Sequence, residues 1–103
     1  MDVPNITVNH VEYSVQETDK PLLLHGRECT GTINFDDLLI KMKAALPFQR
    51  KRQTLMHEIV HAIACELNIK EIEDSEDITE LLGIALADTL ARNKWIVEDA
   101  KNN

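Results

Sequence analysis

Hydrophobic and polar positions follow two different periods along the chain, and the period changes near Pro47. Before Pro47, apolar and often β-branched residues alternate with polar ones, which is typical of strands with one buried face. Gly26 and the Asp36-Asp37 pair indicate turns within this part of the chain. Residues 5–43 are therefore expected to form a small antiparallel sheet of three or four strands, placed at 6–15 (kinked near residues 9 and 10), 22–25, 29–35 and 38–42.

After Pro47 the apolar period is that of a helix. No residue from 48 to 67 breaks a helix, and Pro47 suits the start of the first turn. At 100° per residue, the apolar side chains of this segment fall on one broad arc. His57, Glu58 and His61 fall on the remaining, polar arc. The pattern therefore predicts an amphipathic helix that presents these three side chains together.

A second helix is expected over 78–96, after a polar connection at 68–76. Asp77 is a suitable N-cap for it, and Glu80 then stands at the third helical position, as in a capping box. A sheet followed by two main helices predicts an α+β fold. The length of 103 residues fits one domain over 1–103.

Composition narrows the classes of function. The net charge of −7, from 11 basic and 18 acidic residues, disfavours non-specific binding to nucleic acid or to an anionic membrane. No apolar run reaches the ~18 residues of a membrane span, and the start MDVPNITVNHVEY has neither the basic start nor the apolar stretch of a signal peptide. Cys29 and Cys65 form no CxxC motif, so free thiols in a reducing cytoplasm are expected.

The strongest chemical signal is an HExxH motif, which runs from His57 and Glu58 to His61. Residues i and i+4 of a helix lie on one face, about 6 Å apart along the axis, so two imidazoles can hold one ion. Neutral imidazole suits Zn²⁺, and the Glu58 carboxylate can take a proton from a metal-activated water. A chain of this composition would contain about 0.015 such motifs by chance. The alternative interpretation is two half-buried histidines that bind backbone groups.

A catalytic zinc site needs a third protein ligand and an open position for water. Cys65 follows His57 by eight residues, about 12 Å along a helix, which is too far for one ion to bridge. The metzincin spacing also fails, because Leu67 stands where that motif has its third histidine. The third ligand is therefore expected from the second helix, whose acids are Glu76, Asp77, Glu80 and Asp88. Glu80 opens an apolar stripe of this helix, and a buried carboxylate is costly unless it is paired or binds a metal. We therefore expect Glu80 to complete a site for one zinc ion, with Asp88 as the second choice.

Two segments together resemble a known group of enzymes. Residues 54–62, TLMHEIVHA, and residues 80–83, ELLG, resemble the gluzincin metallopeptidases, most closely the compact ImmA/IrrE-type proteins of phages and bacteria. The resemblance implies a small sheet, an HExxH helix and a glutamate helix, in that order. It also implies a specific intracellular protein as target, such as a repressor-type regulator of a phage or mobile element.

The resemblance assigns a role to each matching residue. It implies that His57 and His61 are metal ligands, that Glu58 is the general base and acid, and that Glu80 is the third ligand. Larger gluzincins often carry a carboxylate at the position of Ile84, where it steadies a ligand histidine, and this chain lacks it. The chain also lacks the separate DNA-binding region of some longer relatives.

These observations predict a zinc-dependent peptidase that acts on a specific intracellular protein. An extended substrate could align by strand addition on 29–35 or 38–42. No oxyanion-stabilising residue can be assigned, and the candidates are Tyr13, His10 and His25.

Two other functions remain open. One is a catalytically weak metal-binding interaction module of phage or mobile-element origin, whose basic segment 41–52 docks an acidic partner. The other is a metal-free structural domain. Neither direct nucleic-acid binding nor membrane binding is expected.

Overall fold

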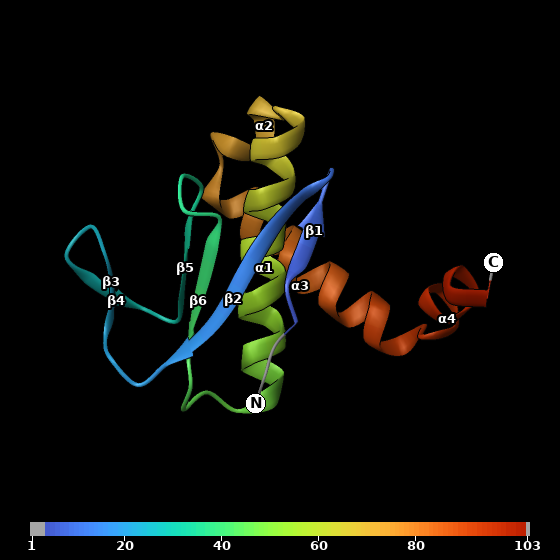
Figure 1. Ribbon diagram of the computed structural model, residues 1–103, viewed down its shortest axis with the longest axis horizontal. Coiled ribbons are helices and arrows are strands. Elements are labelled where there is room, and N and C mark those ends of the chain that lie inside the picture. The colour runs from blue at the N-terminus through green and yellow to red at the C-terminus, as the bar shows by residue number, and fades with distance from the viewer. Residues whose placement is uncertain (1–3, 103) are drawn as a thin grey trace.

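Within residues 4–102, which a computed structural model describes, six short strands precede four helices (Figure 1). Residues 1–3 and 103 of the predicted domain lie outside this range. The strands are β1 (Ile6–Val8), β2 (Val11–Thr18), β3 (Leu22–Leu24), β4 (Arg27–Cys29), β5 (Gly31–Asn34) and β6 (Leu39–Lys43). The helices are α1 (Phe48–Leu67), α2 (Lys70–Glu73), α3 (Glu76–Arg92) and α4 (Trp95–Asn102). The predicted α+β class with two main helices, α1 and α3, is confirmed.

The main sheet is mixed, so the prediction of a purely antiparallel sheet is wrong for one pair of strands. Its order is β1-β2-β6-β5, and β2 and β6 run parallel with Val15 opposite Ile40. The other two pairs, β1–β2 and β5–β6, are antiparallel. Between β2 and β6 the chain forms the separate β3–β4 hairpin and then β5, and β6 inserts between β2 and β5. Alternation of apolar and polar residues predicts where strands lie, but it does not determine whether two strands pair parallel or antiparallel.

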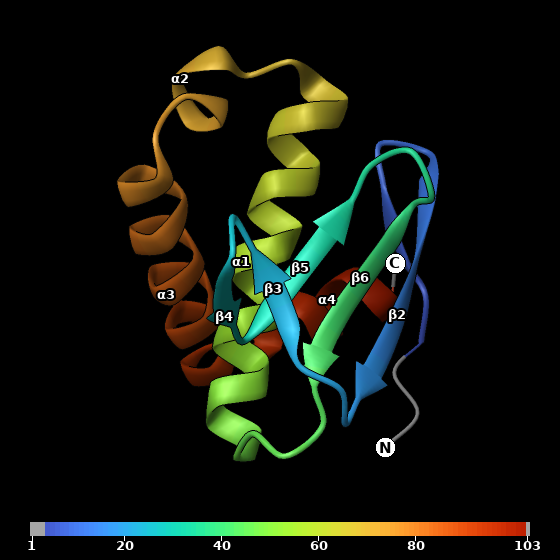
Figure 2. The same cartoon turned by 90° about the vertical axis from the view of Figure 1, so that its left-hand side faces the viewer.

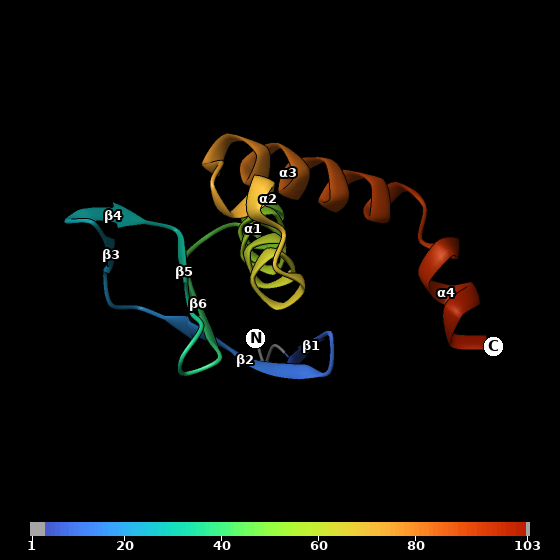
Figure 3. The same ribbon diagram turned by 90° about the horizontal axis from the view of Figure 1, so that it is seen from above.

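Helix α1 lies between the sheet and α3 (Figure 3). The two apolar residues of β6 that face it, Ile40 and Met42, are buried. They form the core together with side chains of the first two strands and of α1, namely Val8, Tyr13 and Ala62. On the other side of α1, helix α3 runs beside it in the opposite direction (Figure 2). This arrangement leaves one polar face of α1 between the β5 edge and α3.

The helix boundaries follow the sequence closely for α1 and less closely for α3. Helix α1 spans the predicted 48–67 and ends at Asn68, which adopts the left-handed conformation (φ 57°) typical of a C-cap. Helix α3 begins two residues before the predicted 78, because the Ser75 hydroxyl accepts a hydrogen bond from the Ile78 N–H (3.2 Å) and caps it in place of Asp77.

The second predicted helix, 78–96, is in fact two helices. Helix α3 ends at Arg92, and α4 starts at Trp95. The break is at Asn93, whose backbone N–H and side-chain amide both donate to the Thr89 carbonyl. Asparagine side chains compete with the helix for backbone groups in this way. None of the helices in the described residues is both long and apolar enough to cross a membrane.

Candidate metal centre

His57 and His61 point from one face of α1 into the space between α1, β5 and α3. Their Nε2 atoms lie 3.1 Å apart, and their rings meet edge to face at a centroid distance of 4.8 Å. The structure therefore brings the two imidazoles together, as their i, i+4 spacing predicts. Burial lowers the pKa of His61, although the nearby Glu76 carboxylate opposes this effect. A lowered pKa favours the neutral imidazole that binds metals.

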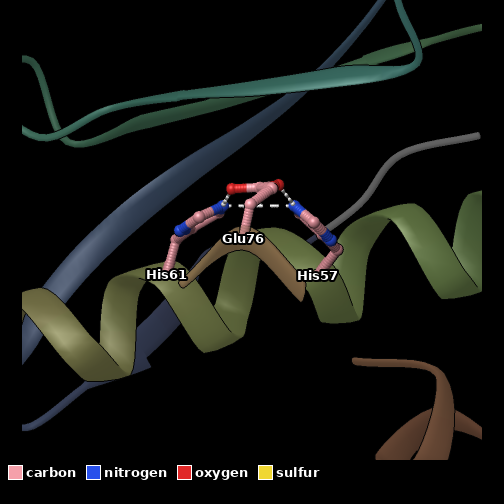
Figure 4. A group of neighbouring side chains, drawn as sticks. All are labelled: His57, His61 and Glu76. Carbon is pink, nitrogen blue, oxygen red and sulfur yellow. Dashed lines mark hydrogen bonds and ion pairs between the residues drawn. The ribbon is translucent and has the colours of Figure 1, made fainter. Parts of the chain in front are cut away.

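The carboxylate of Glu76 is the acid nearest to this pair of nitrogens (Figure 4). Its Oε1 lies 2.9 Å from the His57 Nε2, and its Oε2 lies 3.5 Å from the His61 Nε2. Ligand atoms at 2.0–2.2 Å from a tetrahedral zinc ion would lie about 3.3–3.6 Å apart. Two imidazole nitrogens and one carboxylate are also a usual zinc ligand set. The donor set and its spacing therefore fit a zinc ion.

Glu80 contacts the other nitrogen of the same imidazole. Its Oε2 lies 2.8 Å from the His57 Nδ1, although the two atoms are not aligned as a hydrogen bond. Metal-binding histidines commonly present their second nitrogen to a carboxylate, which fixes the ring and makes it more basic. The geometry thus favours Glu76 as the third ligand and Glu80 as the residue that orients His57. The assignment of Glu80 as ligand stays a prediction.

The remaining acid considered from the sequence, Asp88, is not part of this centre. Its carboxylate accepts a hydrogen bond from the Arg92 side chain (2.9 Å), and both side chains are exposed. Glu76 was one of the four acids of the second helix that could supply the third ligand, and Glu80 was preferred to it because Glu80 opens the apolar stripe of that helix. The available signal was the spacing of Glu76 and Glu80, four residues apart and hence on one helix face.

Glu58 is a buried carboxyl group beside the histidines. The residue is only 5% exposed, and its Oε1 lies 4.0 Å from the His57 Nε2. Burial, reinforced by the negative charges of Glu76 and Glu80 and opposed by His57, raises the pKa of Glu58 to about 7. Its Oε2 has no hydrogen-bond partner among the described residues. A buried carboxylate with an unused oxygen and a pKa near neutrality is suited to exchange a proton with a water or substrate.

Two glycines allow the elements around the site to approach closely. A Cβ atom at Gly83 of α3 would lie 3.0 Å from the Cα of His57. A Cβ atom at Gly31 of β5 would lie 2.5 Å from the Thr54 Cγ2 and 3.7 Å from the Glu58 Cγ. Gly83 therefore lets α3 bring its acids to His57, and Gly31 lets β5 lie directly over the motif.

A cleft of about 570 Å³ opens onto the metal centre. The motif residues and both acids line one side of it, and β5 lines the other. Strand β5 is an edge strand of the sheet, whereas β6 is central, so only the first of the two predicted peptide-docking segments has a free edge. The Lys43 N–H donates to the Thr30 carbonyl (3.0 Å), and alternation along the strand then directs the backbone groups of Gly31 and Ile33 to that edge. The Gly31 N–H already donates to the Cys29 thiol.

None of the three oxyanion candidates lines the cleft. Tyr13 is fully buried under α1, and its hydroxyl donates to the Glu66 carboxylate. Burial, together with Glu66, raises the pKa of Tyr13. His10 and His25 are exposed and occupy turns with positive φ angles of 71° and 53°. All three candidates therefore lie away from the cleft.

Part of the basic segment 41–52 is neutralised within the molecule. Lys43 lies 2.5 Å from Glu28, and Lys51 forms an ion pair with Glu17. Arg52 lies over the ring of Phe48, within the first turn of α1. Two of the five bases of this segment, which are Lys41, Lys43, Arg50, Lys51 and Arg52, are therefore paired with acids of the same chain.

Comparisons with known proteins assign the chain to no family. No protein-family model matches it, and no curated protein or solved structure matches it either. A function must therefore be argued from the residues of the site.

Proposed function

We propose that this protein is a zinc-dependent peptidase that acts on a specific intracellular protein. One observation carries the proposal: His57, His61 and Glu76 offer three ligand atoms within 4.8 Å of one another, directly beside the buried carboxyl group of Glu58. The HExxH spacing produces this arrangement, and the cleft above it is open to an extended chain.

In the proposed reaction, some side chains of the site hold the metal ion and another transfers the proton. A bound zinc ion supplies a Lewis acid that polarises the substrate carbonyl and makes water more acidic. His57, His61 and Glu76 would hold it, and Glu80 orients the His57 ring from the opposite side. Glu58 accepts the proton of the attacking water, because its pKa near 7 allows it to be ionised at neutral pH. The same carboxyl group then donates that proton to the leaving amine.

The edge of β5 supports a peptide as substrate. An extended segment can add to this edge through the Ile33 N–H and carbonyl and through the Gly31 carbonyl, which places the segment above the motif. The apolar side chains of Leu24, Phe35 and Leu46 line the same cleft and can receive side chains of the added segment. A reducing, cytoplasmic compartment belongs to the proposal and is supported by the free thiols Cys29 and Cys65.

The test combines metal analysis with one conservative substitution. Protein purified without chelator is expected to contain about one zinc per chain, and a denatured-proteome peptide library is expected to show new, chelator-sensitive cleavage sites. Glu58→Gln should retain the zinc and lose the cleavage. Equal cleavage by Glu58→Gln, or the absence of zinc from the wild type, contradicts the proposal.

A second function is favoured by the position of the oxyanion candidates. Because Tyr13, His10 and His25 all lie outside the cleft, the chain is also a candidate for a catalytically weak metal-binding interaction module. In that case zinc is bound, no library peptide is cleaved, and Glu58→Gln leaves binding to a partner unchanged. The peptidase and the interaction module both bind zinc, so metal analysis alone distinguishes them from a metal-free structural domain.

A further inference from the structure

The outward face of α3 is largely apolar, and its large apolar residues are exposed in the part of the chain that the structure describes. Thr79, Gly83 and Ala87 are buried on the side that faces α1. On the opposite side, large apolar residues are exposed, and Leu81 is 67% exposed. Large apolar side chains that gather on one exposed face typically mark an interaction surface. The outer face therefore has the composition of an interaction surface.

The exposed residues form a regular stripe. Ile78, Leu82, Ala85 and Thr89 are spaced by four, three and four residues, which is the spacing of a seam between two packed helices. The small Ala85 lies near the middle of the stripe, where two helix backbones can approach most closely. The spacing therefore indicates another helix as the covering element.

The charges at the two ends of α3 favour an antiparallel second copy of the same helix. Asp74 and Asp77 lie at its start, and Lys94 lies at its end together with Arg92, whose charge is shared with Asp88. When two copies pack antiparallel about a two-fold axis, each acidic end meets a basic end, and the helix dipoles oppose one another favourably. A two-fold symmetric interface requires a surface that is complementary to itself, and an apolar stripe with opposite charges at its two ends meets this requirement.

The apolar surface is large enough for a dimer. Flanking residues Leu81 and Leu86 are exposed, and Trp95, Ile96 and Val97 add exposed apolar area where α4 leaves the body (Figure 1). Together these side chains expose on the order of 700 Å², close to the ~800 Å² that each partner buries in a standard interface.

We propose that two copies of this chain form a two-fold symmetric dimer through antiparallel packing of the α3 stripe, Ile78, Leu82, Ala85 and Thr89. The buried side of α3 carries the contact with His57, so the dimer leaves both clefts open. The end of each α3, from which α4 departs, lies beside the start of the partner's α3. This proposal does not depend on zinc binding or on cleavage.

Light scattering coupled to gel filtration tests the proposal, with the full chain over a micromolar to submillimolar concentration range. The wild type is expected to have twice the 11.7 kDa mass of one chain. Leu82→Glu places two like charges near the two-fold axis and should weaken the dimer by roughly 30-fold or more. Leu23→Glu is a matched control, because Leu23 is an exposed leucine (64%) on the distant β3–β4 hairpin, and it should leave the dimer intact.

A cross-link tests the geometry itself. Ala85→Cys should form a disulfide-linked dimer under mild oxidation, because the two copies of this residue meet near the axis, whereas Glu71→Cys on α2 should not. A monomeric wild type overturns the proposal. A dimer that survives Leu82→Glu, or that Leu23→Glu dissociates, also overturns it, since the interface would then lie elsewhere. Circular dichroism of each variant distinguishes dissociation from unfolding.

Discussion

Glu76 and Glu80 contact opposite nitrogens of one imidazole, and this difference predicts different effects on metal binding. Glu76 lies 2.9 Å from the His57 Nε2, whereas Glu80 lies 2.8 Å from the Nδ1. Glu76→Gln should lower zinc affinity by more than 100-fold, and Glu80→Gln should lower it by roughly 10- to 100-fold, the usual effect of a residue that orients a ligand. Competition with a chromophoric chelator measures both affinities.

The same competition experiment includes a control variant, and one of its outcomes would contradict the assignment of Glu76 as ligand. Asp88→Gln changes an acid of the same helix that is paired with Arg92, and it should leave zinc affinity unchanged. If Glu80→Gln loses zinc more completely than Glu76→Gln, the original prediction of Glu80 as ligand is correct instead.

Glu58 makes the metal-free protein less stable as the pH rises. The pKa of this carboxyl group is about 7 in the folded chain, against an ordinary value of 4.5. Between these values the folded state holds a proton that the unfolded state releases, so stability falls as the pH rises through this window. The difference corresponds to a loss on the order of 3 kcal/mol by pH 8. Urea unfolding in chelator should show this loss in the wild type and its absence in Glu58→Gln.

Exposed Glu71 offers a comparison for that measurement. Glu71→Gln should keep the full pH dependence of the wild type. A Glu58→Gln protein whose free energy of unfolding falls between pH 5 and pH 8 as steeply as that of the wild type would contradict the raised pKa.

At the residue scale, the sequence predicted that the two histidines of the motif meet, whereas the choice between Glu76 and Glu80 as the third ligand stays a prediction. The i, i+4 spacing is a local property, so the convergence of His57 and His61 could be derived from helix geometry alone. The start of α3 was predicted two residues too late, because Ser75, rather than Asp77, caps this helix. Both residues are good caps, and only the packing of α3 on α1 decides between them.

Gly83 controls the distance between the two helices of the site. Because a Cβ atom there would lie 3.0 Å from the His57 Cα, Gly83→Val should push α3 away from His57. We expect a loss of about 1–3 kcal/mol in the free energy of unfolding, typical of overpacking, and a weaker zinc affinity. Gly83→Ala should be milder, since alanine returns about 1 kcal/mol of helix propensity. A Gly83→Val protein with wild-type stability and zinc affinity would show that the close approach is not needed.

If the protein is a peptidase, as proposed, a substitution at the free edge of β5 should lower peptide cleavage without lowering zinc content. Ile33→Pro removes an N–H that points to this edge without removing a bond of the β5–β6 ladder. Zinc content should be unchanged, and kcat/KM for a cleaved peptide should fall by about tenfold, the effect of one lost hydrogen bond. Ile33→Ala controls for the lost side chain. Equal activity of the two variants would show that substrates do not add to β5.

At the element scale, the existence of the strands was predictable and their arrangement was not. Alternating residues located β1, β2 and β6 because each has one buried face. The parallel pairing of β2 with β6 depends on contacts between residues about 25 positions apart, which no local pattern encodes. Asn93 likewise ends α3 through its own hydrogen bonds, although the apolar period continues to residue 96.

For the whole molecule, a bound ion would link α1 to α3 and so stabilise the entire fold. Binding to the folded state alone contributes about 4 kcal/mol when free zinc is 1,000 times its dissociation constant. A domain of this size gains roughly 4–8 °C for each kcal/mol, so zinc should raise the melting temperature by about 15–30 °C, and chelator should reverse the rise. The double variant His57→Ala/His61→Ala should show no response to zinc. An unchanged melting temperature in the wild type, together with unchanged metal content after dialysis against zinc, would leave the two histidines of the motif without a metal to bind.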